Sequence, residues 1–382
     1  MKFIIDKQAF ATQLSDVSRA VSTKSAIPVL TGIKITATEE GITLIGSDAE
    51  ISIESFLSLD NESYNLTIEK TGSVVVTARL FNDIIRKLPT DTVTITVNEQ
   101  YLVTIESGKA IFTLNGVDGS AYPHLPVIDV ERRIQLPTVL FKNLINQTII
   151  STSTQETRPV LTGINITAFD GYLVGVATDS HRLSQREIPI GTSKDKLGFD
   201  SMTIPKKTVQ ELTRIVEDNQ DIYMMVMEQQ VIFIIDNITI YSRLLEGNYP
   251  ETSRLIPSSY SSEIVVNAEE FLYSIDRAAL MAHQGKNNAV QLNIESGLVE
   301  LLVHGNERGK VSEEIKCEEV KGEDLTISFN PDYMKDALGT FGPIAIKIQF
   351  QSAVRPLLLS AVESGEEEHN DLLQLLTPIR TH

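Results

Sequence analysis

Apolar and polar residues alternate in three separate stretches of the chain, and a polar turn containing a glycine interrupts each stretch. The turns are Glu39-Glu40-Gly41, Asp170-Gly171 and Ser296-Gly297. The flanking apolar residues are Ile33, Ile35, Ile42 and Leu44 in the first stretch, Ile164, Ile166, Leu173 and Val176 in the second, and Val290, Leu292, Ile294 and Leu298 in the third. Alternation with a period of two around such a turn predicts a β-hairpin.

A helical pattern precedes each predicted hairpin, and a second one follows it. Before the first hairpin, Phe10, Leu14, Val17 and Val21 fall on one face of a 3.6-residue period. The expected helices before the hairpins span residues 10–21, 140–150 and 271–281, and those after the hairpins span 78–88, 205–216 and 331–338. The last two begin with proline, which suits the first turn of a helix because an N–H there has no partner within the helix.

The hexapeptide PVLTGI occurs at residues 28–33 and again at 159–164, and other landmarks repeat with a similar period. The turn glycines lie 130 and 126 residues apart (41 to 171, then 171 to 297), and AYP at 121–123 lies 127 residues before NYP at 248–250. Repeats of this length are whole domains. We therefore expect an α+β fold of three diverged domain copies, each with two helices and antiparallel sheets, at residues 1–128, 129–256 and 257–382.

Composition argues against several classes of protein. No run of 18 apolar residues would span a membrane, and Asp6 interrupts the N-terminus too early for a secretory leader, so a cytoplasmic location is expected. The single cysteine, Cys317, excludes an intramolecular disulfide and a multi-thiolate metal site. The net charge of -18 argues against tight binding of nucleic acid, because that affinity comes largely from neutralised phosphates.

Two segments imitate catalytic motifs. GNERGK, at residues 305–310, is one residue short of a phosphate-binding loop, and Val311 replaces the serine or threonine that would hold magnesium. The six histidines form no HExxH or HxxxH pair, so we expect neither a metal nor another cofactor. ATDSHRL, at residues 177–183, brings Asp179 and His181 close in sequence. A catalytic group and a turn that lines a cleft are both open interpretations, although neighbouring residues of a strand or turn point apart.

Three tandem domains that carry TRPVLTGI, VATDSHRL, EGNYP and LLTPIR in this order resemble the bacterial sliding clamps, the β subunits of DNA polymerase III. The resemblance covers the whole chain. It implies a non-catalytic processivity factor of DNA replication, in which two three-domain chains join head to tail and six domains form a ring around double-stranded DNA without sequence specificity.

The resemblance also implies the partners of the ring. These are the DNA polymerase III α subunit, the clamp loader, and other polymerases and repair factors that carry a clamp-binding peptide, all in the cytoplasm at the nucleoid. Two other functions stay open on the sequence alone. One is a hydrolase that uses Asp179 and His181, and the other is a monomeric multidomain scaffold without a role on DNA.

In the family, helices line the hole, and the helices after the hairpins offer a polar face for this. Their polar stripes are Arg79, Asn82 and Arg86, and Lys207, Gln210 and Arg214; the opposite, core-facing stripes are Leu80, Ile84 and Leu88, and Val209, Leu212 and Val216. The residues expected to face DNA are Lys24, Arg79, Arg86, Lys207 and Arg214. A modestly basic lining inside an acidic exterior would keep DNA centred, whereas an ordinary solvated face is the alternative.

Partners of the family insert a short peptide, roughly Gln-x-x-Leu-Phe, into an apolar cleft between domains 2 and 3. The resemblance places the upper subsite at Leu161, Thr178, His181, Arg182, Leu183, Pro250, Leu255, Leu375 and Thr377. It places the adjoining groove at Asn330, Tyr333, Val354, Pro378, Ile379 and Arg380. Ser180 stands where many relatives have glycine, and Thr377 stands where an apolar residue is common. Leu30, in the first PVLTGI, has no matching tail and is expected to be structural.

The contact between the two chains of the ring would pair Phe112 and Leu114 of one chain with Leu280 and Met281 of the next. The alternative for each of these residues is the core of its own domain. The charged rim known in the family is sparse here, since Ile111 stands where a basic residue can occur.

Overall fold

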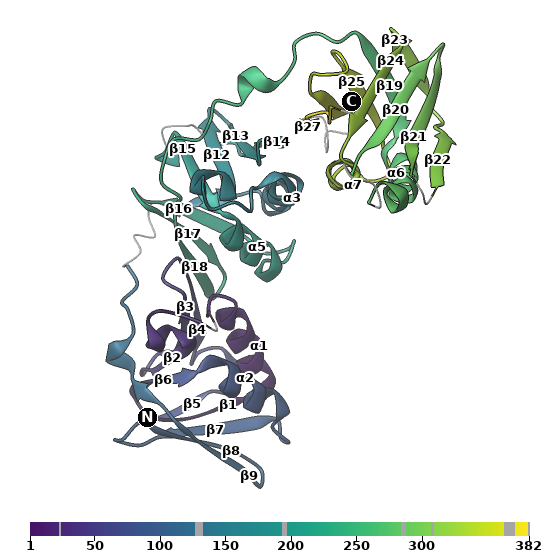
Figure 1. Cartoon of the computed structure of the whole chain (residues 1–382). Helices are drawn as coiled ribbons and strands as arrows, with labels where there is room; N and C mark the ends of the chain where they lie inside the picture. The colour runs from purple at the N-terminus through teal and green to yellow at the C-terminus, as the bar shows by residue number, and fades with distance from the viewer. Residues whose placement is uncertain are drawn as a thin grey trace. The chain divides into compact units, whose positions relative to one another are not determined.

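The computed structural model describes residues 1–22, 24–126, 133–192, 197–283, 288–306, 309–362 and 371–380. Figure 1 labels the helices and strands along the chain. The chain forms two compact units, and each is described by itself: Met1–Thr138 with Lys207–Leu244, and Val139–Lys206 with Leu245–His382. The second predicted repeat therefore contributes to both units. Within the described ranges, no helix is long and apolar enough to cross a membrane.

The first unit contains two antiparallel sheets. One has the order β5-β1-β7-β8-β9, formed by β1 (Lys2–Asp6), β5 (Thr67–Lys70), β7 (Thr92–Val97), β8 (Leu102–Ser107) and β9 (Ala110–Asn115). The other has the order β10-β6-β2-β3-β4-β18-β17-β16-β11, formed by β2 (Gly32–Ala37), β3 (Gly41–Ser47), β4 (Ile51–Ser58), β6 (Gly72–Thr77), β10 (Val117–Asp118), β11 (Ile134–Leu136), β16 (Ile222–Val226), β17 (Gln230–Ile235) and β18 (Ile238–Arg243). Because β4 pairs with β18, this sheet joins the first repeat to the second.

The second unit repeats this plan. Its larger sheet has the order β15-β12-β13-β14-β27-β26-β25-β19-β23, formed by β12 (Gly163–Phe169), β13 (Tyr172–Thr178), β14 (Arg182–Pro189), β15 (Ser201–Pro205), β19 (Ser262–Asn267), β23 (Glu319–Gly322), β25 (Ala345–Phe350), β26 (Leu357–Ala361) and β27 (Leu372–Leu376). Its smaller sheet has the order β22-β21-β20-β24, formed by β20 (Val290–Glu295), β21 (Leu298–Asn306), β22 (Gly309–Glu314) and β24 (Leu325–Phe329). Here the β14–β27 pairing joins the second repeat to the third.

The three predicted hairpins are confirmed as β2–β3, β12–β13 and β20–β21. Gly171 and Gly297 adopt φ angles of 82° and 81°, so the turns require the left-handed conformation that glycine accepts at no steric cost. Gly41 serves another purpose. It begins β3, and a Cβ there would lie 2.3 Å from the carbonyl oxygen of Leu57 on the neighbouring strand. The equivalent turn glycine is therefore needed for space in the first repeat, and for backbone conformation in the second and third.

The predicted helices are also present: α1 (Lys7–Ser18), α2 (Ala78–Lys87), α3 (Thr138–Thr148), α5 (Lys206–Ile215), α6 (Ala268–Ala282) and α7 (Pro331–Gly339). The first begins three residues earlier than its apolar pattern indicates. The carboxylate of Asp6 accepts a hydrogen bond of 2.8 Å from the N–H of Ala9 and so caps the helix directly after β1. In the same way, the side chain of Asn267 accepts from the N–H groups of Glu269 and Glu270 and starts α6 earlier.

One predicted core residue is wrong. Leu80 on α2 is 50% exposed, whereas Ala78, Phe81, Ile84 and Ile85 are buried. At 100° per residue these four positions form one stripe, and Leu80 lies about 40° outside its edge. The side chain of Leu80 therefore adds an apolar group to the solvent-facing side of α2.

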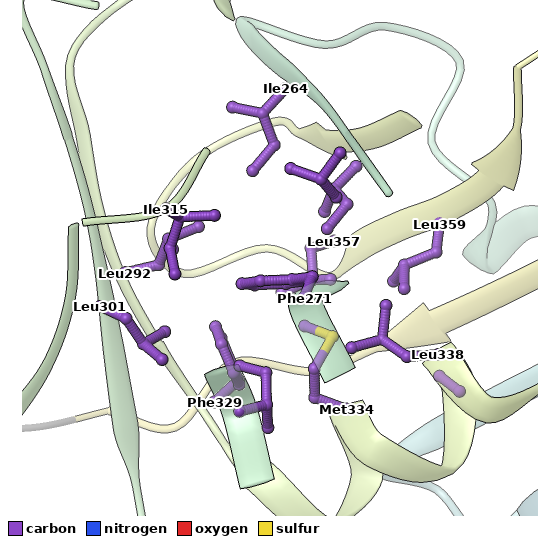
Figure 2. Close-up of a cluster of buried hydrophobic side chains, with 14 of the residues drawn as sticks. Ile264, Phe271, Leu292, Leu301, Ile315, Phe329, Met334, Leu338, Leu357 and Leu359 are labelled. Carbon is purple, nitrogen blue, oxygen red and sulfur yellow. The ribbon is translucent and has the colours of Figure 1, made fainter. Parts of the chain in front are cut away.

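Aromatic rings lie in the cores of the first and third repeats. In the first, Phe10 of α1 packs edge to face with Phe3 of β1 and with Phe81 of α2, at centroid distances of 5.8 and 6.1 Å. In the third, Figure 2 shows Phe271 of α6 and Phe329 of β24 within a buried apolar cluster. Its other labelled side chains are Ile264, Leu292, Leu301, Ile315, Met334, Leu338, Leu357 and Leu359. Helices and both sheets of that repeat thus share one core.

Glu54 on β4 provides a test of how burial affects this fold. Burial raises the pKa of the Glu54 carboxyl, and the nearby positive charge of Lys34 offsets part of the rise. A raised pKa means that the folded state favours the protonated form of Glu54. The protonated carboxyl therefore contributes to the stability of the fold at low pH, and this contribution is lost as the pH rises through the folded pKa. We therefore expect Glu54→Gln, which is neutral at every pH, to raise the melting temperature at pH 7.

Thermal unfolding followed by calorimetry at pH 7 and near pH 4 would check this prediction. The gain should shrink at the lower pH, because the wild-type carboxyl is then increasingly protonated. The exposed Glu40, between β2 and β3, gives the matched control Glu40→Gln with the same change of net charge. Equal gains from the two variants would attribute the effect to the overall negative charge and not to burial.

Candidate partner-binding site

The turn between β13 and β14 is held by its own polar side chains. The carboxylate of Asp179 accepts hydrogen bonds from the N–H groups of His181 and Arg182, at 2.9 and 3.0 Å. The hydroxyl of Thr178 donates to the carbonyl of Arg182 at 2.7 Å and accepts from the N–H of Ser180 at 3.2 Å. Ser180 itself has a φ of 78°, which explains why glycine also suits this position.

This geometry does not support the hydrolase interpretation of Asp179 and His181. One carboxylate oxygen of Asp179 holds the turn, and the other accepts from Nε of Arg182 at 3.0 Å. The imidazole of His181 instead lies along the ring of Tyr333, with centroids 6.4 Å apart and planes 25° apart. A catalytic base needs a carboxylate that orients its imidazole, and Asp179 is committed elsewhere.

Arg182 links the turn to α7. Besides its contact with Asp179, its Nη1 lies 2.5 Å from the carboxylate of Asp336, and its guanidinium lies 4.4 Å above the ring of Tyr333. The side chain of Arg182 is only 14% exposed. Because the ion pairs and the ring contact act together, the guanidinium has one well-defined position on the second unit.

The C-terminal tail runs beside the same turn. β27 pairs with β14, so Leu375 lies opposite Leu183. Beyond the strand, the N–H and the hydroxyl of Thr377 both donate to the carbonyl of His181, at 2.9 and 2.7 Å. The N–H of Ile379 then donates to the carbonyl of Ser328 at the end of β24. The N–H and the hydroxyl of Thr377 are therefore both hydrogen-bonded within the protein, which reduces the effect of their polarity on an incoming ligand.

The residues of the expected cleft divide into a buried floor and an accessible surface. The floor consists of Leu161, Thr178, Leu183 and Leu375, all with at most 6% exposure. The accessible residues are His181, Leu255, Val354 and Arg380, and the half-buried ones are Arg182, Pro250, Asn330, Tyr333, Thr377, Pro378 and Ile379. The side chain of Asn330 caps α7 by accepting from the N–H of Asp332, which gives it a structural role as well.

Sequence reasoning missed Asp336. A signal was present, because Asp336 follows Tyr333 by three residues and so lies on the same face of α7. Its partner Arg182, however, is 154 residues away, and no local pattern indicates that pairing.

The first repeat contains a copy of the same backbone frame. Ala49 adopts a φ of 79°, and the N–H of Arg243 donates to the carbonyl of Glu50 at 2.9 Å, which is the counterpart of the bond from Thr377 to His181. Here the turn carboxylate, Asp48, forms its ion pair with Lys207 of α5. Leu30 is fully buried, as expected for a structural residue.

The residues expected to face DNA fall into two groups. Lys24, Arg79, Arg86 and Arg214 are exposed. Arg86 donates to the hydroxyl of Ser15 on α1 at 2.9 Å, and Arg214 forms an ion pair of 2.8 Å with Glu211 on its own helix. Lys207 is half-buried, and its ammonium group is bound by Asp48. The ion pair offsets the positive charge that Lys207 was expected to contribute.

The residues expected to join the chains lie on one edge strand and on a helix beside another. β9 is an edge of the smaller sheet in the first unit, where Ile111 and Phe112 are 65% and 39% exposed. β22 is an edge of the smaller sheet in the second unit, and Leu280, on the neighbouring α6, is 70% exposed. These exposures exclude the domain core for Phe112 and Leu280. Leu114 and Met281 are half-buried.

Tandem α+β repeats that share continuous sheets, with helices beside them, define the class of DNA-clamp proteins. Family profiles of the DNA polymerase III beta subunit match the chain in order: the N-terminal domain at residues 1–126, the central domain at 135–251 and the C-terminal domain at 253–375. The chain belongs to this family.

Relatives that match over their full length support the same family assignment. The chain is 44% identical over 385 residues to the beta sliding clamp of Bacillus subtilis and 41% identical over 382 residues to that of Streptococcus pneumoniae, with at least 99% of each chain covered. The crystal structure of the Bacillus subtilis DNA polymerase sliding clamp matches with a TM-score of 0.94 at 44% identity. That of the Streptococcus pneumoniae DNA polymerase III beta chain matches with a TM-score of 0.94 at 40% identity, and both matches cover all of each chain.

Proposed function

We propose that this protein is the processivity clamp of DNA replication, a ring of two chains that encircles double-stranded DNA and tethers the polymerase. The observation that carries this conclusion is the match over the full length to proteins named beta sliding clamp, at 44% identity. A processivity clamp tethers without turnover, so we expect no catalytic activity. A cytoplasmic location at the nucleoid follows from the same function.

The two exposed edges support a ring. β9 of one chain and β22 of the next are different surfaces, so their contact is heterologous, and two such contacts close a dimer in which neither β9 nor β22 is left as a free edge. We assign Phe112, Leu114, Leu280 and Met281 to this contact. A monomeric scaffold would leave both edge strands, and the exposed apolar side chains of β9 and α6, open to solvent.

The distribution of charge supports sliding on DNA. The net charge of -18 repels phosphates from most of the surface, while Lys24, Arg79, Arg86 and Arg214 supply exposed positive charge. We assign these four residues to the lining of the hole, with Lys207 beside them as a neutralised member. Contacts of this kind read no sequence and weaken with salt.

We further assign the cleft on the second unit to the peptides of partner proteins. Its buried apolar floor and its few fixed polar groups fit the insertion of a short apolar peptide. Partners of this kind are the polymerase III α subunit, the clamp loader, and other polymerases and repair factors. The residues assigned to the cleft are Leu161, Thr178, His181, Arg182, Leu183, Pro250, Leu255, Asn330, Tyr333, Val354, Leu375, Thr377, Pro378, Ile379 and Arg380.

Retention on circular DNA tests the ring directly. A clamp loader would place the protein on a nicked circle, and the bound fraction would be measured in about 0.5 M salt before and after a restriction enzyme cuts the circle. At that salt concentration phosphate contacts are largely screened, so only topology retains the protein. We expect retention on the circle and loss within minutes of cutting. A protein that stays bound to the linear product would contradict a sliding ring.

A further inference from the structure

A pocket on the larger sheet of the first unit contains none of the residues assigned to the ring contact, the DNA lining or the peptide cleft. Its volume is about 350 Å³, which lies within the range of pockets that bind small ligands. It is formed by side chains of β2, β3, β4 and β18 and by the segment 123–126. The lining residues are Lys34, Ile45, Glu54, Pro123, His124, Leu125, Pro126 and Tyr241.

The floor of this pocket places two opposite charges on either side of an apolar side chain. Ile45 of β3 lies opposite Lys34 of β2 on one side and opposite Glu54 of β4 on the other. Directly opposed residues point to the same face of a sheet, so all three side chains stand in one row. Two strand spacings separate the backbones of Lys34 and Glu54 by about 10 Å. Lys34 therefore acts on Glu54 through space, and within the described part of the chain neither charged group forms an ion pair or a side-chain hydrogen bond.

The other polar groups around the pocket leave both charges available to a ligand. Asp118 interacts electrostatically with Lys34, but its carboxylate accepts a hydrogen bond of 2.9 Å from a backbone N–H two residues later and so caps a short turn. Tyr241 is only 6% exposed; burial raises the pKa of its hydroxyl, and the charge of Glu54 raises it further, so the group stays a neutral hydrogen-bond donor. His124 is exposed. The floor thus offers one cation and one anion.

The second repeat shows that the fold does not require these charges. The residues 131 positions after Lys34, Ile45 and Glu54 form the equivalent row across β12, β13 and β14, and they are Asn165, Val176 and Gln185. The apolar centre is kept, while both flanking side chains are neutral amides. Burial opposes the ionisation of Glu54, so an ionised carboxylate at this position costs stability. A charge kept at such a cost, where the fold accepts a neutral side chain, is typical of a binding site.

We propose that this pocket binds a ligand that carries an ammonium group and a carboxylate at opposite ends of a short apolar chain. The ammonium lies at Glu54, the carboxylate lies at Lys34, and the chain packs on Ile45. A chain of about five carbon atoms spans about 7 Å when extended and permits one ion pair at each end. A carboxy-terminal lysine of a peptide and free 6-aminohexanoate both have this spacing. The inference goes beyond the proposed clamp function and is independent of it.

Isothermal titration calorimetry of the full-length protein tests the proposal with four probes. The peptide Ser-Gly-Ser-Ala-Lys with a free terminal carboxylate represents a chain end, and 6-aminohexanoate represents a free small molecule. The amidated peptide and hexylamine are matched controls, because each keeps the ammonium group and lacks the carboxylate. We expect each control to bind at least about tenfold more weakly than its charged counterpart. Binding of the peptide would assign the pocket to chain ends, and binding of 6-aminohexanoate alone would assign it to free small molecules; both outcomes support the proposal.

Two substitutions locate the binding in this pocket. Glu54→Gln and Lys34→Gln should each weaken binding at least about tenfold, because each removes one of the two ion pairs. Glu54→Gln also removes the cost of a buried charge, so this variant is expected to fold. The matched controls Glu40→Gln and Lys70→Gln change the same charges at exposed positions of the same unit and should bind like the wild type.

Three results would overturn the inference. The first is that neither the peptide nor 6-aminohexanoate binds. The second is that hexylamine binds as tightly as 6-aminohexanoate, and the third is unchanged binding in Glu54→Gln. The proposed clamp function would stand in each case, because retention on circular DNA is measured separately.

Discussion

Phe112→Asp is expected to convert the ring into folded single chains. Phe112 lies on the edge strand β9 and is 39% exposed in the single chain, so the fold itself depends little on its ring. In the proposed contact, the substitution forfeits about 1.5–3 kcal/mol of apolar burial and places an unpaired carboxylate in a dry interface, which costs more. A ring of two chains contains this contact twice. We therefore expect the dimer dissociation constant to rise at least a hundredfold.

Sedimentation velocity over a range of protein concentrations would measure this change, with calorimetry to show that the variant is folded. The control is Phe169→Asp. Phe169 is also 39% exposed, lies at the end of β12 in the larger sheet of the second unit, and stacks on Tyr172 at 4.9 Å. It should cost some stability and leave the ring intact. If Phe112→Asp sedimented like the wild type at every concentration, the assignment of β9 to the contact would be wrong.

The hairpins and helices were predictable because their signals are local. The period of apolar residues that marks a strand or a helix is visible within about ten residues of sequence, and each of the three repeats gave an independent example of it. The first residue of a helix was less predictable where a capping hydrogen bond determines it. Asp6, for example, starts α1 before the apolar stripe begins, and this requires a hydrogen bond from Ala9 that hydrophobic periodicity does not reveal.

The charges at the candidate sites were less predictable, because distant residues decide them. Lys207 belongs to a clear polar stripe of α5, yet its partner Asp48 lies 159 residues earlier in the chain. Arg182 and Asp336 present the same difficulty. A sequence indicates which residues are charged and on which face they lie, but an ion pair forms only where the fold brings two such faces together. The surface charge relevant to DNA or peptides is therefore a property of the tertiary structure.

A chain that ends after Leu376 is expected to lose peptide binding while it keeps its fold. β27 ends at Leu376 and keeps its pairing with β14 and β26 on both sides. The truncation removes the hydrogen bonds of Thr377 and Ile379 to the carbonyls of His181 and Ser328. It also removes the apolar contact area that Pro378 and Ile379 offer to a peptide. A loss of about 2 kcal/mol or more of binding free energy corresponds to at least about a thirtyfold higher dissociation constant.

Anisotropy with the neutral peptide Gln-Asn-Asn-Leu-Phe would measure this loss, and sedimentation would show that the ring persists. The matched control is a chain that ends after Arg380, which keeps the tail residues assigned to the cleft and lacks only the last two. It should bind like the full-length protein, so that the loss is assigned to residues 377–380. Because the proposed ring contact and the proposed cleft use different residues, Phe112→Asp should retain peptide binding and the chain ending at Leu376 should retain the ring. Equal peptide affinity in the two truncated chains would show that the tail is only a structural support for β14, and would move the peptide away from Thr377.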